Sequence, residues 1–343
     1  MEAKRIKTDR LEVAYLEAGD PARPVVMLVH GNVSSSWFWE DMMESLSQDF
    51  YVLAPDLRGY GETEPLAIDA TRGLRDWSED VRSFVQSLRL DRQLHMLGWS
   101  MGGGVVMQYA IDYPNEVSSL MLMNPVSPFG FGGTKDEQGT PCYPNFAGSG
   151  GGTANPQFIE LLSQRATGEE QPHSPRNVLN QFYVKPPFRL DAQKEDRFVR
   201  SMLSTKLGSG FYPGTFETCA EWPGVAPGDK GINNALSPKY LNLAAFADLE
   251  PQIPVLWIRG ADDQIVSDSS LFDFGYLGKL GYVPGWPGMD EFPPQPMVSQ
   301  MRVVLERSGN FEEWVVENTG HSPHLEKRDF FLEKIRGFIK RTM

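Results

Sequence analysis

Gly98-Trp99-Ser100-Met101-Gly102 stands between an apolar run, Leu94 to Leu97, and a helical pattern that extends from Met101 to about Tyr113. A G-x-S-x-G pattern in this context is typical of a sharp strand-to-helix turn, in which the small residues let the two arms of the turn approach and the serine has strained backbone angles. Such a turn pushes the serine oxygen out of the sheet, and the helix directs its first free N–H groups to the same place. The pattern predicts that Ser100 is a nucleophile.

Two later stretches contain the partners that a serine nucleophile needs. The apolar strand Val255 to Ile258 leads into an acidic turn with Asp262 and Asp263, and a last strand, Phe311 to Val316, leads to His321. A serine hydroxyl is a poor nucleophile near neutral pH, so it needs an imidazole within hydrogen-bond reach, and the imidazole needs a carboxylate to fix its tautomer. The chain order is therefore Ser, Asp, His, and all three lie at predicted strand ends.

With this order the chain resembles the α/β-hydrolase superfamily over residues of about 4–128 and 250–343. Two further stretches resemble the family: Val29-His30-Gly31-Asn32 after a predicted strand, and the D-x-R-G-x-G turn from Asp56 to Gly61. The resemblance implies that the backbone N–H groups of Asn32 and Met101 hold the oxyanion. We interpret the turn at Asp56 as structural support.

The resemblance also decides between neighbouring candidates. Family members with a doubled acid before Ile-Val generally use the second acid, which favours Asp263 over Asp262 as the partner of the histidine. The Gly-His pair favours His321 over His324. Asn124 occupies the family's alternative acid position, but an amide cannot serve as a carboxylate.

The hydrophobic pattern alternates between strands and helices, which predicts an α/β fold with an eight-stranded, mostly parallel sheet and helices on both faces. We expect strands at Arg5–Lys7, Leu11–Glu17, Val25–Val29, Tyr51–Ala54, Gln93–Leu97, Ser118–Met123, Val255–Ile258 and Phe311–Val316, and helices near Trp37–Leu46, Ser78–Leu88, Met101–Tyr113 and Lys327–Arg341. Ligands of such sheets bind beyond the carboxyl ends of the strands, where the three candidates fall.

The pattern changes between the sixth and seventh predicted strands. We expect residues 1–124 and 250–343 to form the hydrolase core and residues 125–249 to form an inserted cap, which begins with a stretch rich in Gly, Pro and aromatic residues, Phe129 to Gly152. The alternative for this Gly-rich stretch is a flexible linker, but linkers seldom carry so many aromatic residues. A second insertion, 272–296, follows the acid turn. It either lines the mouth of the pocket or packs on the cap without touching substrate.

The charge and the apolar content of the chain bear on which partners it can bind and where it is located. The formal net charge of −13 argues against nucleic acid and anionic membranes, which bind basic patches. The start of the chain lacks the apolar core of a signal peptide, and no stretch is apolar enough to span a bilayer, so we expect a cytoplasmic protein. Two unpaired thiols, Cys142 and Cys219, are then favoured over a disulfide. No metal or cofactor motif is present, and we expect a reaction that needs neither.

These features predict a serine hydrolase that cleaves a small-molecule carboxylic ester or lactone through an acyl-enzyme. Relatives use the same triad for haloperoxidase side chemistry, C–C bond hydrolysis or N-terminal proline removal, the last of which needs an acidic pocket that Glu160, Glu169, Glu170 or Glu217 could supply. Epoxide hydrolases and haloalkane dehalogenases need an aspartate where this chain has Ser100. A non-catalytic receptor of this fold with a small ligand under the cap stays a further alternative. The oligomeric state is left open.

Overall fold

A computed structural model describes all 343 residues and contains one central sheet of eight strands. The strand order is β1-β2-β4-β3-β5-β6-β11-β12. The bounds are β1 Lys4–Lys7, β2 Glu12–Ala18, β3 Val25–Val29, β4 Tyr51–Pro55, β5 Leu94–Trp99, β6 Val117–Met123, β11 Val255–Gly260 and β12 Phe311–Val316. The predicted sheet is confirmed, and each of the eight predicted strands forms within it.

Within this sheet the strands β4, β3, β5, β6, β11 and β12 run parallel to one another. Strand β2 runs antiparallel to both of its neighbours, β1 and β4. The register places Trp99 at the end of β5 opposite Met123 at the end of β6, and Met123 opposite Ile258 of β11. Residues that follow these strands therefore meet at one edge of the sheet, although they are far apart in the sequence.

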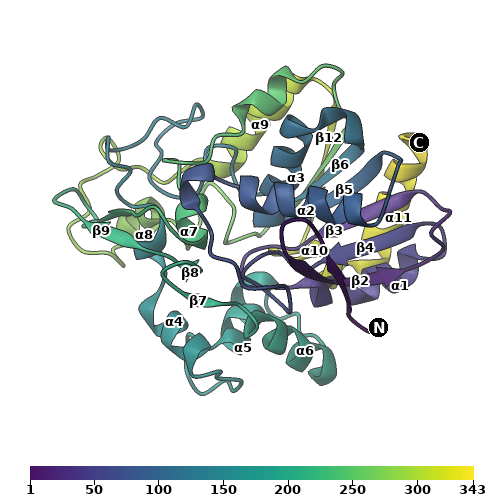
Figure 1. Cartoon of the computed structure of the whole chain (residues 1–343). Helices are drawn as coiled ribbons and strands as arrows, with labels where there is room; N and C mark the ends of the chain where they lie inside the picture. Colours follow the sequence, from purple (N-terminus) through teal and green to yellow (C-terminus); the bar gives the residue numbers. More distant parts are fainter.

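Helices cover both faces of the sheet, which is why strands such as β3 and β4 are buried along their whole length. In Figure 1, α2 and α3 lie in front of the sheet and α1 and α11 behind it. The core helices are α1 Glu40–Leu46, α2 Arg75–Ser87, α3 Met101–Asp112, α9 Met297–Ser308, α10 Pro323–Glu326 and α11 Arg328–Arg341, with 3₁₀ turns at Ser36–Trp39, Ala70–Arg72, Pro114–Glu116 and Ala244–Asp248.

The predicted helices form with small shifts at their ends. The first turn of the predicted 37–46 helix is a 3₁₀ turn, and α2 begins at Arg75 rather than Ser78. The helix α9 connects the second insertion to β12 and is not among the helices predicted from the sequence.

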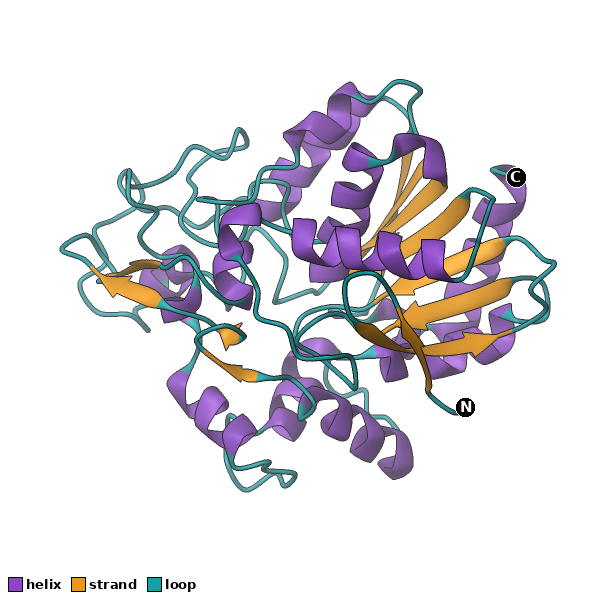
Figure 2. Ribbon diagram, viewed as in Figure 1, coloured by secondary structure: helices purple, strands orange, loops and turns teal.

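The segment between β6 and β11, residues 124–254, is built from short elements. It lies beside and below the sheet in Figures 1 and 2, where loops outweigh helices and strands. Besides the 3₁₀ turn Ala244–Asp248 given above, its elements are a 3₁₀ turn Gly151–Thr153, α4 Pro156–Ser163, α5 Pro175–Val178, a π-helical turn η5 Leu179–Tyr183, α6 Ala192–Met202, β7 Leu207–Gly208, β8 Tyr212–Pro213, β9 Phe216–Thr218, β10 Val225–Pro227 and α7 Ile232–Ala235.

The glycine-rich part of this segment is held by side-chain amides. Gly132 N–H donates to Gln295 Oε1 at 2.6 Å, and Gly151 N–H donates to Asn234 Oδ1 at 2.8 Å. Such bonds fix a backbone that has no side chains of its own to pack. The stretch is therefore part of a packed body.

The loop after the acid turn packs against the same segment. It contains α8, Phe274–Lys279, and its Phe272 ring meets Phe182 edge-on with ring centroids 5.1 Å apart. Trp222 Nε1 also donates to Pro284 O at 2.9 Å. The two insertions expected from the sequence thus touch each other.

Two smaller expectations concern membranes and thiols. None of the helices is both long enough and apolar enough to cross a membrane. Cys142 and Cys219 are free thiols. The cytoplasmic location stays a prediction from the sequence.

Candidate functional site

Ser100 lies on the turn between β5 and α3 with φ 57° and ψ −123°, a backbone conformation that residues with a Cβ rarely adopt. The turn exists because its neighbours are glycines. A Cβ on Gly98 would lie 2.3 Å from Gly102 O, and a Cβ on Gly102 would lie 2.3 Å from Val29 O. The predicted strained serine is therefore present; the close approach of the two arms explains Gly98, and the close approach of α3 to the end of β3 explains Gly102.

The loop after β3 lies directly against Ser100. A Cβ on Gly31 would be 2.9 Å from Ser100 Cβ and 3.5 Å from its Oγ. The N–H of Met101 is the first of α3 and has no partner within the helix, and the N–H of Asn32 donates no hydrogen bond within the protein. Both predicted oxyanion donors are thus free to bind a ligand atom.

His321 and Asp263 form a buried pair. His321 Nδ1 lies 2.8 Å from Asp263 Oδ2, and their side chains are 2% and 3% exposed. The other carboxylate oxygen of Asp263 accepts the N–H groups of Ile265 at 2.8 Å and Val266 at 3.2 Å. Because an ionised carboxylate can only accept, Nδ1 of His321 carries the proton and Nε2 is left as the acceptor.

The neighbouring acid points elsewhere. Asp262 Oδ2 accepts from Lys185 Nζ at 2.7 Å, and its side chain is 42% exposed. The geometry therefore brings Asp263 and not Asp262 to the histidine, as the sequence predicted.

Ser100 and His321 are joined through their neighbours and not by a direct hydrogen bond. Trp99 Nε1 donates to His321 O at 2.8 Å, and Asn124 Nδ2 donates to the same oxygen at 2.8 Å. Asn124 Oδ1 also accepts from Gly260 N at 2.9 Å.

Sequence reasoning missed these two contacts. It gave Trp99 no role and noted only that the amide of Asn124 cannot serve as a carboxylate, whereas both side chains donate to the backbone carbonyl of His321. A signal for Asn124 was its place at the end of β6, beside the strands that carry the serine and the acid.

His324 packs beneath the site. Its ring centroid lies 4.8 Å from that of Trp39 and 5.5 Å from that of Trp99, and neither ring nitrogen has a hydrogen-bond partner. Burial lowers the pKa of His324 to about 3. The preference for His321 over His324 agrees with this position.

We predict that His324→Leu makes the protein less sensitive to acid. The folded-state pKa lies below the ordinary value of 6.5, so the unfolded chain binds this proton first, and His324 costs stability progressively as pH falls from 6.5 toward 3. In the His324→Leu variant, the unfolding free energy should therefore decrease less steeply with falling pH, by roughly 1 kcal/mol per pH unit in that window. Urea melts of parent and variant between pH 7 and about pH 4.5 measure this, and equal slopes would contradict it.

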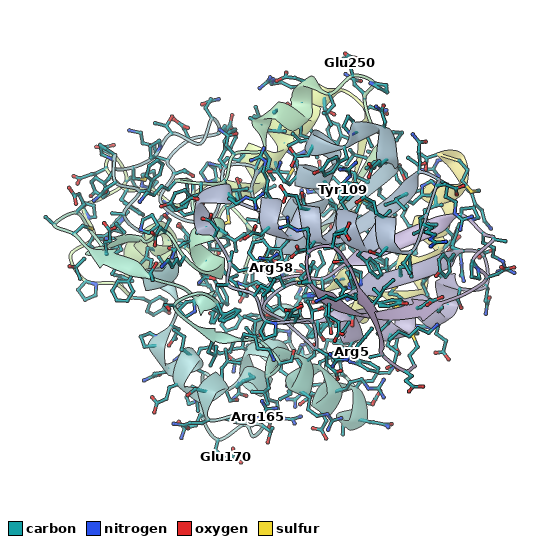
Figure 3. The ribbon with its side chains drawn as sticks, viewed as in Figure 1. Arg5, Arg58, Tyr109, Arg165, Glu170 and Glu250 are labelled. Atoms are coloured by element: carbon teal, nitrogen blue, oxygen red, sulfur yellow. The ribbon has the colours of Figure 1, made fainter.

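The other predicted structural residues form the support of the site. His30 Nε2 accepts from Leu57 N at 2.9 Å, and Asp56 accepts from Ser36 N at 2.8 Å. Arg58 donates to both carboxylate oxygens of Asp80 at 2.7 and 2.8 Å. Figure 3 shows Arg58 near the middle of the molecule. The turn after β4 is therefore a support, as the sequence predicted.

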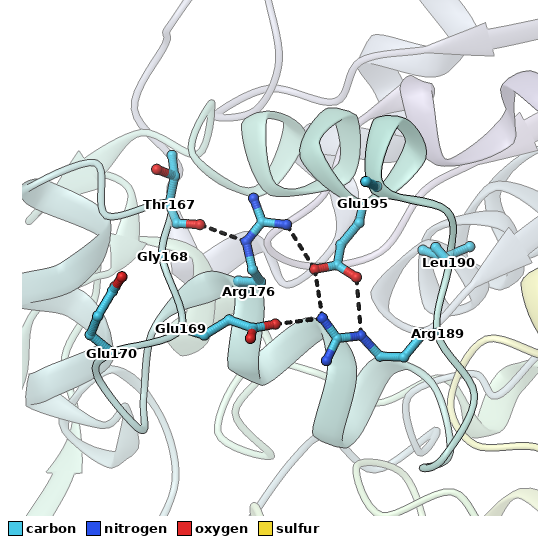
Figure 4. A pocket seen from close by; sticks show the side chains of 9 residues that line it. Thr167, Gly168, Glu169, Glu170, Arg176, Arg189, Leu190 and Glu195 are labelled. Carbon is cyan, nitrogen blue, oxygen red and sulfur yellow. Dashed lines mark hydrogen bonds and ion pairs between the residues drawn. The ribbon is translucent and has the colours of Figure 1, made fainter.

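A hollow of about 660 Å³ lies in the segment between β6 and β11, but none of the five predicted site residues lines it. Its wall is an ion-pair cluster shown in Figure 4, in which the Glu195 carboxylate lies 2.7 Å from Arg176 and 3.1 Å from Arg189. Arg189 also pairs with Glu169. Since these charges neutralise one another, we interpret the cluster as structural, because its ion pairs link α6 to α5 and to the loops that carry Glu169 and Arg189.

No group of three or more His, Cys, Asp or Glu side chains forms a ligand set for a metal ion. The expectation of a reaction without metal or cofactor stays a prediction.

The parallel sheet with a strained serine between β5 and α3 defines an α/β-hydrolase fold. Residues 24–274 match the model of the alpha/beta hydrolase fold family, and the chain belongs to that family. The esterase RhEst1 from Rhodococcus superposes with a TM-score of 0.63 and 19% identity, each chain being covered to 100%. A carboxylesterase from Bacillus subtilis superposes with a TM-score of 0.61 and 15% identity, over 98% of this chain and 91% of that one. These likenesses concern the fold.

Curated relatives match shorter stretches. Epoxide hydrolase 4 from Mus musculus is 28% identical over 120 residues, 35% of this chain and 33% of that protein. Monoacylglycerol lipase ABHD6 from Bos taurus is 27% identical over 127 residues, 36% of this chain and 37% of that protein. The chain therefore spans little more than a third of the length of these relatives.

Proposed function

We propose that the protein is a serine hydrolase that cleaves a carboxylic ester or lactone through an acyl-enzyme. The observation that carries the proposal is the buried His321–Asp263 pair, with Nδ1 and Oδ2 2.8 Å apart, at the sheet edge where the strained Ser100 lies. The esterases among the solved structures and the lipase among the curated relatives support the reaction class.

In the proposed mechanism Ser100 Oγ attacks the carbonyl carbon while His321 Nε2 accepts its proton. Asp263 stabilises the imidazolium that forms, and the N–H groups of Asn32 and Met101 bind the oxyanion. His321 then protonates the leaving group, and the acyl group stays on Ser100. A water molecule repeats the sequence with His321 as base, which releases the acid and restores the serine.

The similarity to epoxide hydrolase 4 does not favour an epoxide hydrolase reaction for this chain. Epoxide hydrolases of this family need an aspartate at the turn between strand and helix, and this chain has Ser100 there. Two of the four acidic residues named for the proline iminopeptidase alternative, Glu169 and Glu170, line a hollow that none of the predicted site residues touches, and Figure 3 shows Glu170 at the lower margin of the molecule.

A substrate screen tests the reaction class. We expect turnover of short or medium-chain nitrophenyl esters or lactones, and much weaker turnover of prolyl anilides and vinylogous diketones. A preference for prolyl anilides or diketones would replace the proposal with the corresponding alternative. Tight binding of a small ligand without turnover of any of these compounds would favour the receptor alternative.

We also propose that residues 125–249 form a cap and that the 272–296 loop borders the same substrate pocket. The Phe182–Phe272 contact supports this, because it joins the two insertions next to Tyr183, whose ring centroid lies 6.2 Å from that of His321. Small-molecule pockets are mostly apolar, and these aromatic rings supply such a surface.

Phe272→Ala is expected to change the preferred acyl length. Changes of fit by one methylene group are worth about 1–3 kcal/mol, or roughly 10- to 200-fold in relative kcat/KM, while an acetyl ester should be affected much less. The measurement is kcat/KM over a series of nitrophenyl esters. Tyr282→Ala, which alters a side chain 72% exposed in the same loop, is the control. An unchanged ranking in Phe272→Ala would count against the pocket.

A further inference from the structure

Three consecutive residues of the inserted segment, Tyr183 to Lys185, touch both loops of the candidate site; we call them the strap. Tyr183 ends the π-helical turn η5 and is 6% exposed. Its hydroxyl oxygen lies 3.1 Å from Asn32 O and 3.2 Å from Val33 O, so its single proton is shared between the two carbonyls. The strap therefore holds the loop that carries the proposed oxyanion donor.

The loop after β3 has a strained backbone, so contacts from its surroundings must stabilise it. Val33 has φ 48°, which is an outlier for a β-branched residue. Strained conformations persist only where the surroundings fix them. On the core side, Ser34 Oγ donates to Gly31 O at 2.8 Å and Tyr60 OH donates to Asn32 Oδ1 at 2.7 Å. On the other side, the inserted segment contributes Tyr183 at the carbonyls, Asn233, whose Oδ1 accepts from Asn32 Nδ2 at 3.2 Å, and Ser201, whose hydroxyl lies 2.6 Å from that of Ser35.

The bond at Gly31 O matters for the direction of the donor. The carbonyl of Gly31 and the N–H of Asn32 belong to one planar peptide unit and point in opposite directions. Fixing the carbonyl on Ser34 therefore aims the N–H, and Tyr183 fixes the next peptide unit through Asn32 O. The two peptide units that flank Asn32 are thus both anchored.

The other end of the strap reaches the histidine loop. Lys185 N–H donates to Glu326 Oε1 at 2.8 Å, and Glu326 Oε2 accepts from Gly320 N at 2.8 Å, next to His321. A Cβ on Gly320 would lie 3.0 Å from Lys185 N, so the two backbones are in contact. One carboxylate thus joins the inserted segment to the residue before the proposed base.

Tyr183 also packs between the two loops. Its ring centroid lies 5.6 Å from that of Trp99 and 6.2 Å from that of His321. We infer that Tyr183 is a positioning residue, through which the strap sets the oxyanion donor Asn32 relative to His321. The inference rests on the proposed function and makes the inserted segment a part of the catalytic geometry in addition to any role over the substrate.

Tyr183→Phe tests the inference because it keeps the ring and removes the hydroxyl. Loss of one oxyanion donor lowers kcat by about 10²–10³, and loosening a donor should cost less, so we expect kcat of an acetyl nitrophenyl ester to fall about 10- to 100-fold. KM should change by less than about threefold, since the donor acts on the transition state. Affinity for a trifluoromethyl ketone, whose adduct carries the oxyanion, should fall in parallel with kcat.

Tyr109→Phe is the matched control. Tyr109 is fully buried in α3, and its hydroxyl bonds Glu116 rather than the site. Its loss should lower the melting temperature without changing kcat. Tyr183→Phe with kcat and ketone affinity within twofold of the parent would overturn the inference, and so would equal losses of kcat in both variants.

Glu326→Gln tests the other end of the strap and replaces the first variant if that fails to fold. An amide can accept only one of the two N–H bonds, so we expect a smaller fall in kcat with KM preserved, and unchanged kcat would overturn the inference. Labelling of the parent at Ser100 by a fluorophosphonate separates the two hypotheses. A parent that is neither labelled nor active overturns the proposed function and the inference together, whereas a labelled parent with unaffected variants overturns the inference alone.

Discussion

Ser100→Ala is expected to lower ester turnover by about 10⁴- to 10⁶-fold, because removal of the nucleophile leaves only binding and oxyanion stabilisation. The fold should be retained, since alanine has the same Cβ as serine at this strained turn and Ser100 Oγ makes no hydrogen bond on which the packing depends. The measurement is kcat/KM of the best nitrophenyl ester, together with the melting temperature of each protein.

A covalent probe makes this experiment independent of the substrate. A fluorophosphonate should modify Ser100 in the parent and leave the variant unlabelled. Ser87→Ala on α2, where the hydroxyl bonds Ser83 O at 2.8 Å, is the control and should keep full activity and labelling. Activity of Ser100→Ala within about tenfold of the parent would rule out the proposed nucleophile.

Asp263→Asn is expected to lower turnover by about 10⁴-fold at pH 7. The structure explains how the amide must sit. The oxygen bonded by the N–H groups of Ile265 and Val266 has to remain an acceptor, so the amide NH₂ faces His321 Nδ1. Nδ1 must then accept, the ring proton moves to Nε2, and His321 can no longer take the proton of Ser100.

The adjacent acid provides the control for this variant. Asp262→Asn loses an ion pair with Lys185 whose partners are 33% and 42% exposed, and pairs of this kind contribute at most about 1 kcal/mol. Its turnover should stay within about tenfold of the parent. The reverse ranking of the two variants in kcat/KM would transfer the role to Asp262.

The sequence by itself determined the framework of the protein. Strand and helix positions followed from hydrophobic periodicity, and the glycines around Ser100 predicted the turn, because only residues without a Cβ allow its arms to approach. The free N–H of Met101 follows from its place at the start of a helix. These are local properties, in which a residue and its near neighbours fix the conformation.

The roles of other residues depended on the tertiary structure. Trp99 and Asn124 are a buried aromatic residue and an amide in the sequence, and they reach His321 O only because β5, β6 and the histidine loop meet at one sheet edge. The sequence preferred Asp263 by family resemblance alone, and the hydrogen bond to His321 supplies the geometric reason.

Tyr183 and Glu326 had no local signal at all. The sequence predicted an inserted segment of 125 residues or so, yet which of its residues returns to the site is set by how that segment folds back across a gap of 150 positions between Tyr183 and Val33. Periodicity reports which face of an element is buried, but it carries no information on which distant backbone carbonyl a buried hydroxyl will meet. Only the packed chain, in which most buried polar groups find a partner, decides that contact.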